Sequence, residues 1–203
     1  SPTKIPLLFG LDVIHGFRTT FPVPLAEASS WGPEAVYRSA RVAATEAAAS
    51  GIHWTFAPMV DIARDPRWGR IVEGSGEDPF LGAAMATARV RGFQTEDPAS
   101  PFTILACPKH FAAYGGAEGG RDYNTVDITE RTLREVYLRP FKAAVDAGAG
   151  TIMCSFNEIG GIPSTASRQL LTDILRTEWG FKGFVVSDWT SIGELQQHGI
   201  AGT

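Results

Sequence analysis

Several hydrophobic runs of this 203-residue sequence end in residues that could take part in chemistry. These residues are Asp12, Lys109, His110, Met153, Ser155, Asn157 and Asp188. A single polar residue at the end of a strand often marks only the point where burial stops. Several such residues at one edge of a sheet would instead surround a cavity rich in hydrogen-bond donors and acceptors. Such a cavity suits an uncharged ligand with many hydroxyl groups.

In the run GFVVSDW, a carboxylate and a large aromatic residue directly follow an apolar strand. An ionised carboxylate held beside the anomeric carbon of a sugar can attack that carbon. Cationic neighbours such as Arg70 and Lys109 would keep Asp188 ionised. The Trp189 ring would provide a wall for the apolar C–H face of the sugar. The chemistry predicted for these residues is therefore nucleophilic attack on a carbohydrate.

The loop PMVDIARDPRWGRIVEGSGEDPFLG concentrates charges of both signs around a tryptophan and several glycines. We expect most of these charges to pair with one another, including Asp65 with one of the arginines. The loop would then cover one side of the cavity. We expect one arginine to point inward, because a planar guanidinium can bind two neighbouring hydroxyls of a ligand.

Other common site types fit this sequence poorly. The histidines are scattered without an HxH or HExxH pattern, so no metal is expected, although Asp12 and His110 could supply two ligands. Ser155 and Ser187 lack the GxSxG elbow of a serine nucleophile. The glycines at 115–120 match neither a P-loop nor a dinucleotide-binding pattern, so no cofactor is expected.

The elements that must position these residues alternate along the chain between apolar strands and helical patterns. Strands are predicted at 7–14, 53–58, 103–111, 151–157 and 183–188, and helices at 33–50, 79–94, 129–147, 167–179 and 191–198. Pro140 predicts a kink or a break in the third helix. Because the strands are continuously apolar, they indicate a parallel sheet that is covered on both faces.

These βα units fit either a doubly wound sheet or a barrel. No glycine-rich dinucleotide loop follows the first strand, and polar residues recur at the carboxyl ends of the strands, where barrel enzymes build their sites. Both observations favour an α/β fold of the (β/α)8 TIM-barrel type. A complete barrel needs about 250 residues, so residues 1–203 are predicted to form one partial barrel domain.

The composition limits the partners of the chain. Its net charge of -4 provides no basic field for nucleic acid, and no apolar run is long enough to cross a membrane. Cys107 and Cys154 lie in apolar strands and are predicted to be buried free thiols.

The motifs FGLDVIHG, PMVDIARDPRWGR, EGSGEDPFL, KHFAAYGGAEGGRDYNTVD and WGFKGFVVSDW together resemble glycoside hydrolase family 3, specifically its bacterial β-glucosidases. The resemblance runs from Leu7 to Gly199 in the right order and spacing. It implies the N-terminal barrel domain of a retaining enzyme that hydrolyses terminal β-linked glucose from oligosaccharides or aryl glucosides. Asp188 would be the nucleophile that forms a glycosyl-enzyme intermediate.

The resemblance also implies how the sugar is bound. Asp12, Arg70, Lys109 and His110 would bind sugar hydroxyls at the innermost subsite. Tyr123 and Met153 match positions that line that subsite, and Trp189 would form an aromatic wall beside the nucleophile.

Family members have features that this chain lacks. Their barrel starts earlier and continues further, and a second α/β sandwich domain commonly supplies the general acid/base glutamate. We therefore assign no acid/base here, although Glu73, Glu77 and Glu118 are candidates; Glu73 and Glu77 match structural positions of the family's loop. The N-acetylglucosaminidase branch fits less well, because its histidine-bearing loop is not found between Met153 and Ser167.

A hypothesis of another class is that the chain is a sugar-binding or structural fragment without turnover. A partial barrel exposes strand edges, so we expect the chain to associate with the remaining segments of the enzyme or with another copy. Relatives of the family are often periplasmic or secreted, and no compartment is assigned to this chain.

Overall fold

The structure is a computed structural model that describes residues 2–97 and 99–202. The helices and strands follow in the order β1 (Gly10–Leu11), α1 (Pro24–Ala28), α2 (Pro33–Ala49), β2 (Trp54–Thr55), η1 (Ile71–Glu73), α3 (Pro79–Phe93), η2 (Tyr114–Gly116), η3 (Glu118–Gly120), α4 (Glu130–Thr132), η4 (Leu133–Tyr137), α5 (Leu138–Asp146), β3 (Thr151–Met153), β4 (Glu158–Ile159), β5 (Ile162–Pro163), η5 (Ser164–Ala166), η6 (Gln169–Glu178), β6 (Phe184–Val186) and η7 (Gly193–Leu195).

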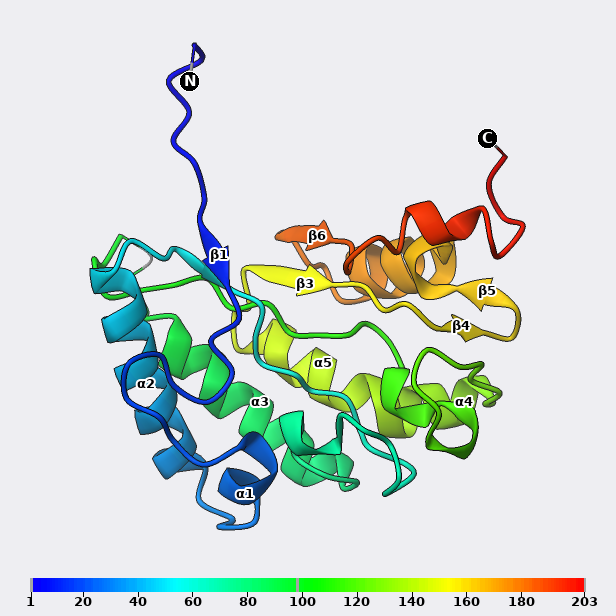
Figure 1. The fold of residues 1–203 in the computed structure, drawn as a ribbon, viewed down its shortest axis with the longest axis horizontal. Coiled ribbons are helices and arrows are strands. Elements are labelled where there is room, and N and C mark those ends of the chain that lie inside the picture. Colours follow the sequence, from blue (N-terminus) through cyan, green and yellow to red (C-terminus); the bar gives the residue numbers. More distant parts are fainter. Residues whose placement is uncertain (1, 98, 203) are drawn as a thin grey trace.

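An open wall is formed by β1, β2, segment 103–111, β3 and β6, which lie side by side in this order, and β4 and β5 form a separate hairpin (Figure 1). β1 pairs in parallel with β2, and β3 pairs in parallel with β6. Segment 103–111 lies between these pairs, because Leu105 bridges to Trp54 and Phe111 bridges to Cys154, both in parallel. The predicted TIM-barrel-like α/β fold is confirmed, and within the described residues the wall does not close.

The predicted strand at 103–111 is not regular. The structure gives it isolated parallel bridges at Leu105, Lys109 and Phe111 instead of a continuous ladder. Pro108 lies in this segment and has no N–H to donate, which interrupts a ladder. The other predicted strands are present but shorter than predicted.

Helices α2, α3 and α5 follow one another along one side of the strands (Figure 1). The buried face of α2 is rich in alanine, including Ala40, Ala44 and Ala47. A Cβ atom at Gly92 of α3 would lie 2.6 Å from the Ala40 side chain, so these small residues allow a close approach of the two helices. The predicted helices at 33–50 and 79–94 are confirmed as α2 and α3.

The predicted helix at 129–147 is continuous from α4 through η4 to α5 and is capped by the Thr129 side chain. The predicted kink or break does not occur at Pro140, which lies within α5. The irregularity lies just before it, where η4 is wound as a π-helix. A wider turn at this point accommodates the proline ring and the missing N–H.

The C-terminal part of the chain differs most from the prediction. The helix expected at 167–179 is the π-helix η6, and the one expected at 191–198 is reduced to the 3-10 turn η7. The β4–β5 hairpin was not predicted; its turn is Gly160-Gly161, in which both glycines have positive φ. Gly183 lets the chain enter β6, since a Cβ there would lie 2.0 Å from the Gly150 carbonyl oxygen.

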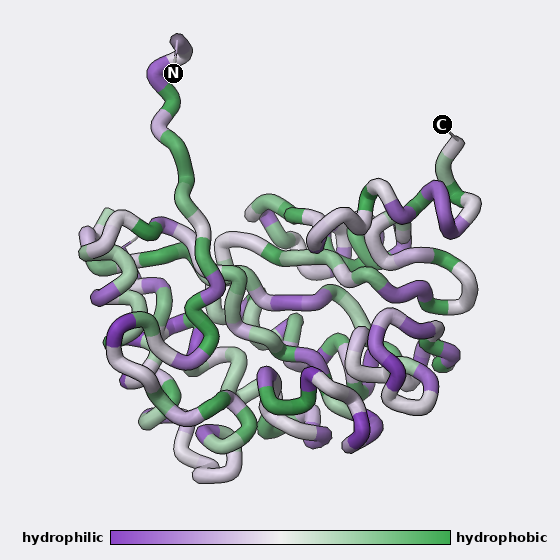
Figure 2. Tube along the Cα trace, viewed as in Figure 1, coloured by the Kyte–Doolittle hydropathy of each residue, from purple (hydrophilic) through white to green (hydrophobic). Residues whose placement is uncertain are grey.

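The edge of the wall at β1 carries exposed apolar residues. The N-terminal segment extends away from the rest of the chain and is largely hydrophobic from Ile5 onward (Figure 2). Ile5, Leu7, Leu8, Phe9 and Leu11 are all exposed. In the part of the chain that the structure describes, no helix combines the length and the apolar character needed to span a bilayer.

Candidate active site

Asp188 follows β6 and carries a carboxylate that is 15% exposed. Its Oδ1 accepts a hydrogen bond of 2.7 Å from the Trp189 backbone N–H. Its Oδ2 has no hydrogen-bond partner among the described residues and lies 3.4 Å from His110 Nε2. The end of β6 thus places a carboxylate beside His110, with one oxygen that is buried and accepts no hydrogen bond from the described residues.

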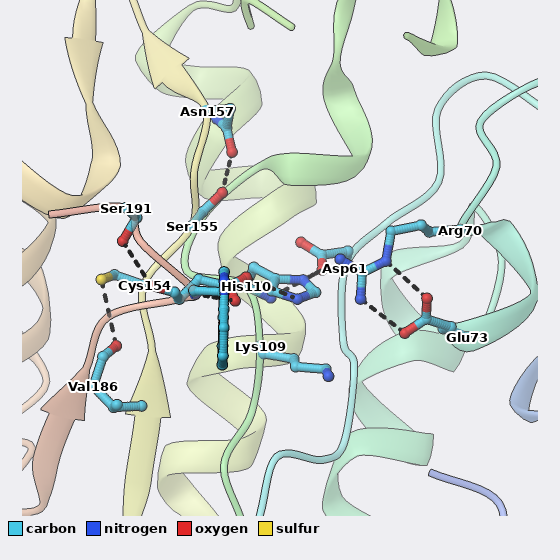
Figure 3. Close-up of polar contacts among 12 residues, drawn as sticks. Asp61, Arg70, Glu73, Lys109, His110, Cys154, Ser155, Asn157, Val186 and Ser191 are labelled. Carbon is cyan, nitrogen blue, oxygen red and sulfur yellow. Dashed lines mark hydrogen bonds and ion pairs between the residues drawn. The ribbon is translucent and has the colours of Figure 1, made fainter. Parts of the chain in front are cut away.

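His110 is buried and lies between two carboxylates. Its ring Nδ1 is 2.8 Å from Asp61 Oδ2, and its backbone N–H donates to the same oxygen at 2.9 Å. Figure 3 shows the Asp61 carboxylate beside the His110 ring. The opposite ring nitrogen faces Asp188, so the imidazole connects the loop after β2 with the end of β6.

Lys109 is buried and Asp12 is exposed, and the two form an ion pair of 2.9 Å between Nζ and Oδ1. Asp12 directly follows β1, and Lys109 belongs to segment 103–111. The pair therefore joins strand ends that are 97 residues apart in the sequence. Together they present a carboxylate and an ammonium group that can each bind a hydroxyl.

Arg70 forms a bidentate pair with Glu73, with distances of 2.7 and 2.9 Å from Nε and Nη2 to the two carboxylate oxygens (Figure 3). Burial alone would raise the pKa of Glu73, but Arg70, Lys109 and His110 hold that pKa below its ordinary value. Burial likewise opposes the charge on Arg70, and the Glu73 carboxylate more than offsets this and raises the pKa of Arg70. The guanidinium also lies over the Tyr114 ring at 5.5 Å.

These groups border two cavities. One has a volume of about 580 Å³ and is lined by Arg70, Tyr123, Phe156, Asp188, Trp189, Thr190, Glu194, Gln197 and His198. The other, of about 280 Å³, is lined by Asp12 and Glu73 with His15 and several apolar residues. Since Arg70 lines the first and Glu73 the second, this ion pair lies between the two cavities.

The structure brings together most of the residues that the sequence singled out. Arg70, Tyr123, Asp188 and Trp189 share one cavity, and Lys109 and His110 connect it to Asp12. Met153 differs, because it is buried within β3 and does not line either cavity.

Ser155 and Asn157, although near strand β3, are buried and hydrogen-bonded to each other (Figure 3). The Asn157 side chain also donates to the Ala112 carbonyl, so both residues serve the internal structure. The sequence did not single out Phe156, which lies between them and lines the large cavity. Its ring packs against that of Tyr123 with the centroids 4.9 Å apart.

The charged loop matches its prediction only in part, because Asp61 is hydrogen-bonded to His110 and Asp78 caps α3 instead of pairing within the loop. Arg67 pairs with Asp65 at 2.6 Å, and these hydrogen bonds lower the pKa of Asp65 to about 2. Arg70 is the arginine that reaches the large cavity.

None of the candidate acid/base glutamates lines the cavity of Asp188. Glu73 is paired with Arg70, Glu77 lines a cavity of about 220 Å³ with Arg64, and Glu118 lines one of about 380 Å³. An acid/base for Asp188 is therefore not found among these three residues.

Cys107 and Cys154 are buried free thiols, as predicted. Burial raises the pKa of Cys107 to about 12 and also raises the pKa of Cys154. Among residues 2–97 and 99–202, no group of three or more histidine, cysteine or acidic side chains could hold a metal ion.

Curated relatives align with nearly the whole chain. A periplasmic β-glucosidase of Salmonella typhimurium is 50% identical over 201 residues, which cover 99% of this chain and 26% of that protein. A β-xylosidase of Formosa agariphila is 41% identical over 192 residues, covering 92% of this chain and 27% of that protein. The chain thus spans about a quarter of the length of these relatives.

Solved structures of β-glucosidases also align with nearly the whole chain. The crystal structure of a β-glucosidase from Listeria innocua matches with a TM-score of 0.95 and 48% identity, covering 97% of this chain and 28% of that one. That enzyme has also been solved in complex with glucose. The model of the glycosyl hydrolase family 3 N-terminal domain matches residues 1–202. By the extent of this match, the chain belongs to glycoside hydrolase family 3.

Proposed function

We propose that the chain is the nucleophile-bearing part of a retaining β-glucosidase and that Asp188 is the nucleophile. The observation that carries the proposal is the Asp188 side chain, which lines a cavity of about 580 Å³ shared with Arg70 and Trp189 and whose Oδ2 contacts His110 without accepting a hydrogen bond. A carboxylate without a hydrogen bond on one oxygen is available for attack. The naming of relatives as β-glucosidases supports glucose as the sugar.

The side chains around Asp188 supply the contacts that a sugar needs. Arg70, His110 and the Asp12–Lys109 pair are proposed to bind hydroxyl groups, because charged donors and acceptors form the stronger hydrogen bonds. Trp189 is 83% exposed and lines the cavity, so its ring offers an apolar face. Tyr123 offers a second ring in the same cavity. Met153 would contribute only as a buried support for the strand end.

The reaction would proceed in two steps. Asp188 attacks the anomeric carbon, a bond forms between that carbon and a carboxylate oxygen, and the glycosidic bond breaks as its oxygen takes a proton from an acid. Water, deprotonated by the same group, then releases glucose with retained configuration. In such enzymes the two carboxyl groups lie about 5–5.5 Å apart.

The acid/base and the closing wall of the barrel are proposed to come from other segments of a longer enzyme. The chain spans 26% of the Salmonella relative, and none of Glu73, Glu77 and Glu118 lines the Asp188 cavity. The substrate would be a β-glucoside or an oligosaccharide with a terminal glucose. The name of the Salmonella relative supports a periplasmic location for the enzyme that contains this chain.

The test is the variant Asp188→Ala in the full-length enzyme, with an aryl β-glucoside as substrate. Loss of the nucleophile should lower kcat by at least about 10³-fold, a cost of roughly 4 kcal/mol in barrier height. Added azide should restore part of the aryl release and yield the α-glucosyl azide, because azide replaces the missing carboxylate from the same face.

The matched control is Asp173→Ala, which removes an exposed surface carboxylate paired with Arg168. This control should keep the activity of the unchanged enzyme. Near-normal hydrolysis by Asp188→Ala would contradict the nucleophile assignment.

The second candidate function is that the chain binds sugar, or serves only as a structural part of a larger barrel, without turnover. The observation that favours it is that none of Glu73, Glu77 and Glu118 lines the cavity of Asp188. Asp12, Arg70, Lys109 and His110 would then bind glucose without hydrolysing a glucoside. The behaviour of the isolated chain separates the two candidates.

A further inference from the structure

Asp61 is the most deeply buried carboxylate next to the site, with a side chain that is 0% exposed. It lies in the charged loop after β2, for which the sequence predicts that most charges pair with one another. The structure gives it a different partner, because its Oδ2 accepts from both the backbone N–H and the ring Nδ1 of His110. Its Oδ1 has no hydrogen-bond partner among the described residues.

These two hydrogen bonds fix both the orientation of the His110 ring and the ring nitrogen that carries the proton. An ionised carboxylate has no proton to donate, so in the 2.8 Å hydrogen bond the ring nitrogen is the donor and Nδ1 carries a proton. The Tyr114 ring packs edge-on against the imidazole at 5.0 Å and limits its rotation. The other nitrogen, Nε2, is then directed at Asp188 Oδ2, 3.4 Å away.

We propose that Asp61 is a positioning residue of this site, acting through His110. By accepting the Nδ1 proton, Asp61 holds the imidazole so that Nε2 lies at the Asp188 end of the site, where a sugar hydroxyl would contact it. The same contacts fix where that hydroxyl lies relative to Asp188. The proposal rests on the proposed function for the identity of the ligand, but the orientation of the ring is a property of the free protein.

The experiment compares Asp61→Ala with Asp61→Asn in the full-length enzyme. Asp61→Ala removes the acceptor, and kcat/KM for an aryl β-glucoside should fall about 100-fold, the effect of a misplaced binding group. Asp61→Asn keeps an amide oxygen that can take the place of Oδ2, so it should recover most of this loss. Asp65→Ala is the matched control, because Asp65 pairs with Arg67 in the same loop, and its activity should stay unchanged.

A second measurement separates positioning from a folding defect. In a His110→Ala background, Asp61→Ala should cause no further loss, since its effect passes through the imidazole. A further loss of similar size would overturn the proposal, as would an Asp61→Asn variant that is no better than Asp61→Ala.

The ring nitrogens provide a test that needs no substrate. In enzyme labelled with ¹⁵N-histidine, the His110 signals are assigned by their absence in His110→Ala. They should show a protonated Nδ1 in the unchanged enzyme and a shift toward the other tautomer in Asp61→Ala. Identical ring signals in the two would refute the proposal. This result stands apart from the nucleophile test, which can fail while the tautomer is fixed as described.

Discussion

Arg70 reaches the large cavity with its guanidinium already oriented. Glu73 binds it through both carboxylate oxygens, and the Tyr114 ring lies beneath it at 5.5 Å. A long arginine side chain otherwise loses about 2 kcal/mol of rotamer entropy when it is immobilised. Because Glu73 has already restricted Arg70, a ligand that binds the guanidinium meets a smaller entropic cost.

Glu73→Gln in the full-length enzyme tests this role. The variant removes the charge that orients Arg70, and KM for an aryl β-glucoside should rise roughly tenfold, or about 1.4 kcal/mol, while kcat changes less. Steady-state kinetics measure both constants. An unchanged KM would contradict the orienting role.

The same variant carries a pH signature. The pKa of Glu73 is lower in the folded chain than its ordinary value, so its ion pair stabilises the folded state above about pH 4.3. This contribution is lost as the pH falls through the lowered pKa. The melting temperature of the unchanged enzyme should therefore exceed that of Glu73→Gln most at neutral pH, and this difference should shrink as the pH falls. Thermal unfolding of both proteins between about pH 3 and 7 measures this difference.

At the level of residues, sequence and structure agree where chemistry is tied to a strand end. Asp188 and His110 lie together because parallel strands place their carboxyl ends at one edge. Asp61 was not recognised, since a carboxylate in a charged loop carries no signal that distinguishes a histidine partner from an arginine partner. Nor do the residue types indicate that the Lys109–His110 and Phe111–Ala112 peptide bonds are cis.

The loop after β6 is an element held by a chain of small polar side chains. Ser191 donates to the Asp188 carbonyl at 3.2 Å. Thr165 Oγ1, from η5, lies 3.1 Å from both Ser191 Oγ and the Ser155 carbonyl oxygen. The backbone of Asp188 is thereby linked through η5 to the end of β3.

Thr165→Val in the full-length enzyme removes the hydroxyl at nearly constant side-chain volume and should loosen this loop. Loss of about 1 kcal/mol of hydrogen bonding is expected to lower kcat roughly fivefold, measured by steady-state kinetics at saturating aryl β-glucoside. Ser164→Ala is the matched control in the same turn, because Ser164 Oγ is buried with no hydrogen-bond partner among the described residues. It should lower kcat less than twofold by the same reasoning. Equal effects of the two variants would rule out a specific role for the chain of hydroxyls.

At the level of elements, the long amphipathic segments were predictable and the strands were predictable only in position. Pro33 in the first turn and the alanine-rich buried face specify α2 locally. A strand has no such local specification, because its length depends on which neighbour it pairs with. The β4–β5 hairpin had a usable signal in Gly160-Gly161, a dipeptide typical of two-residue turns.

The whole molecule has two strand edges without a partner strand in the described residues, at β1 and at β6. The β1 side also carries exposed Ile5, Leu7 and Phe9. Unpaired edges beside apolar surface promote association. The chain alone is therefore expected to behave differently from the complete enzyme.

Production of residues 1–203 alone tests this expectation. Sedimentation velocity should show oligomers or aggregates, and replacing Leu7 and Phe9 together by serine should increase the monomer fraction by removing exposed apolar area. The same preparation should release no p-nitrophenol from its β-glucoside, since no acid/base is assigned within it. A stable monomer would contradict the association, and hydrolysis at a rate near that of the complete enzyme would place the acid in this chain.

The order of the strands in the wall, which follows the order of the sequence, has a consequence for how the site is made. Each strand of the wall can pair with the wall strand synthesised before it, and β6 does so with β3 across the β4–β5 hairpin. The wall can therefore grow as the chain leaves the ribosome. Asp12, Arg70, Lys109 and His110 all lie in the part made first. Asp188 arrives with β6, after each of them. A nascent chain would therefore hold the groups proposed to bind sugar before it holds the carboxylate proposed to attack it.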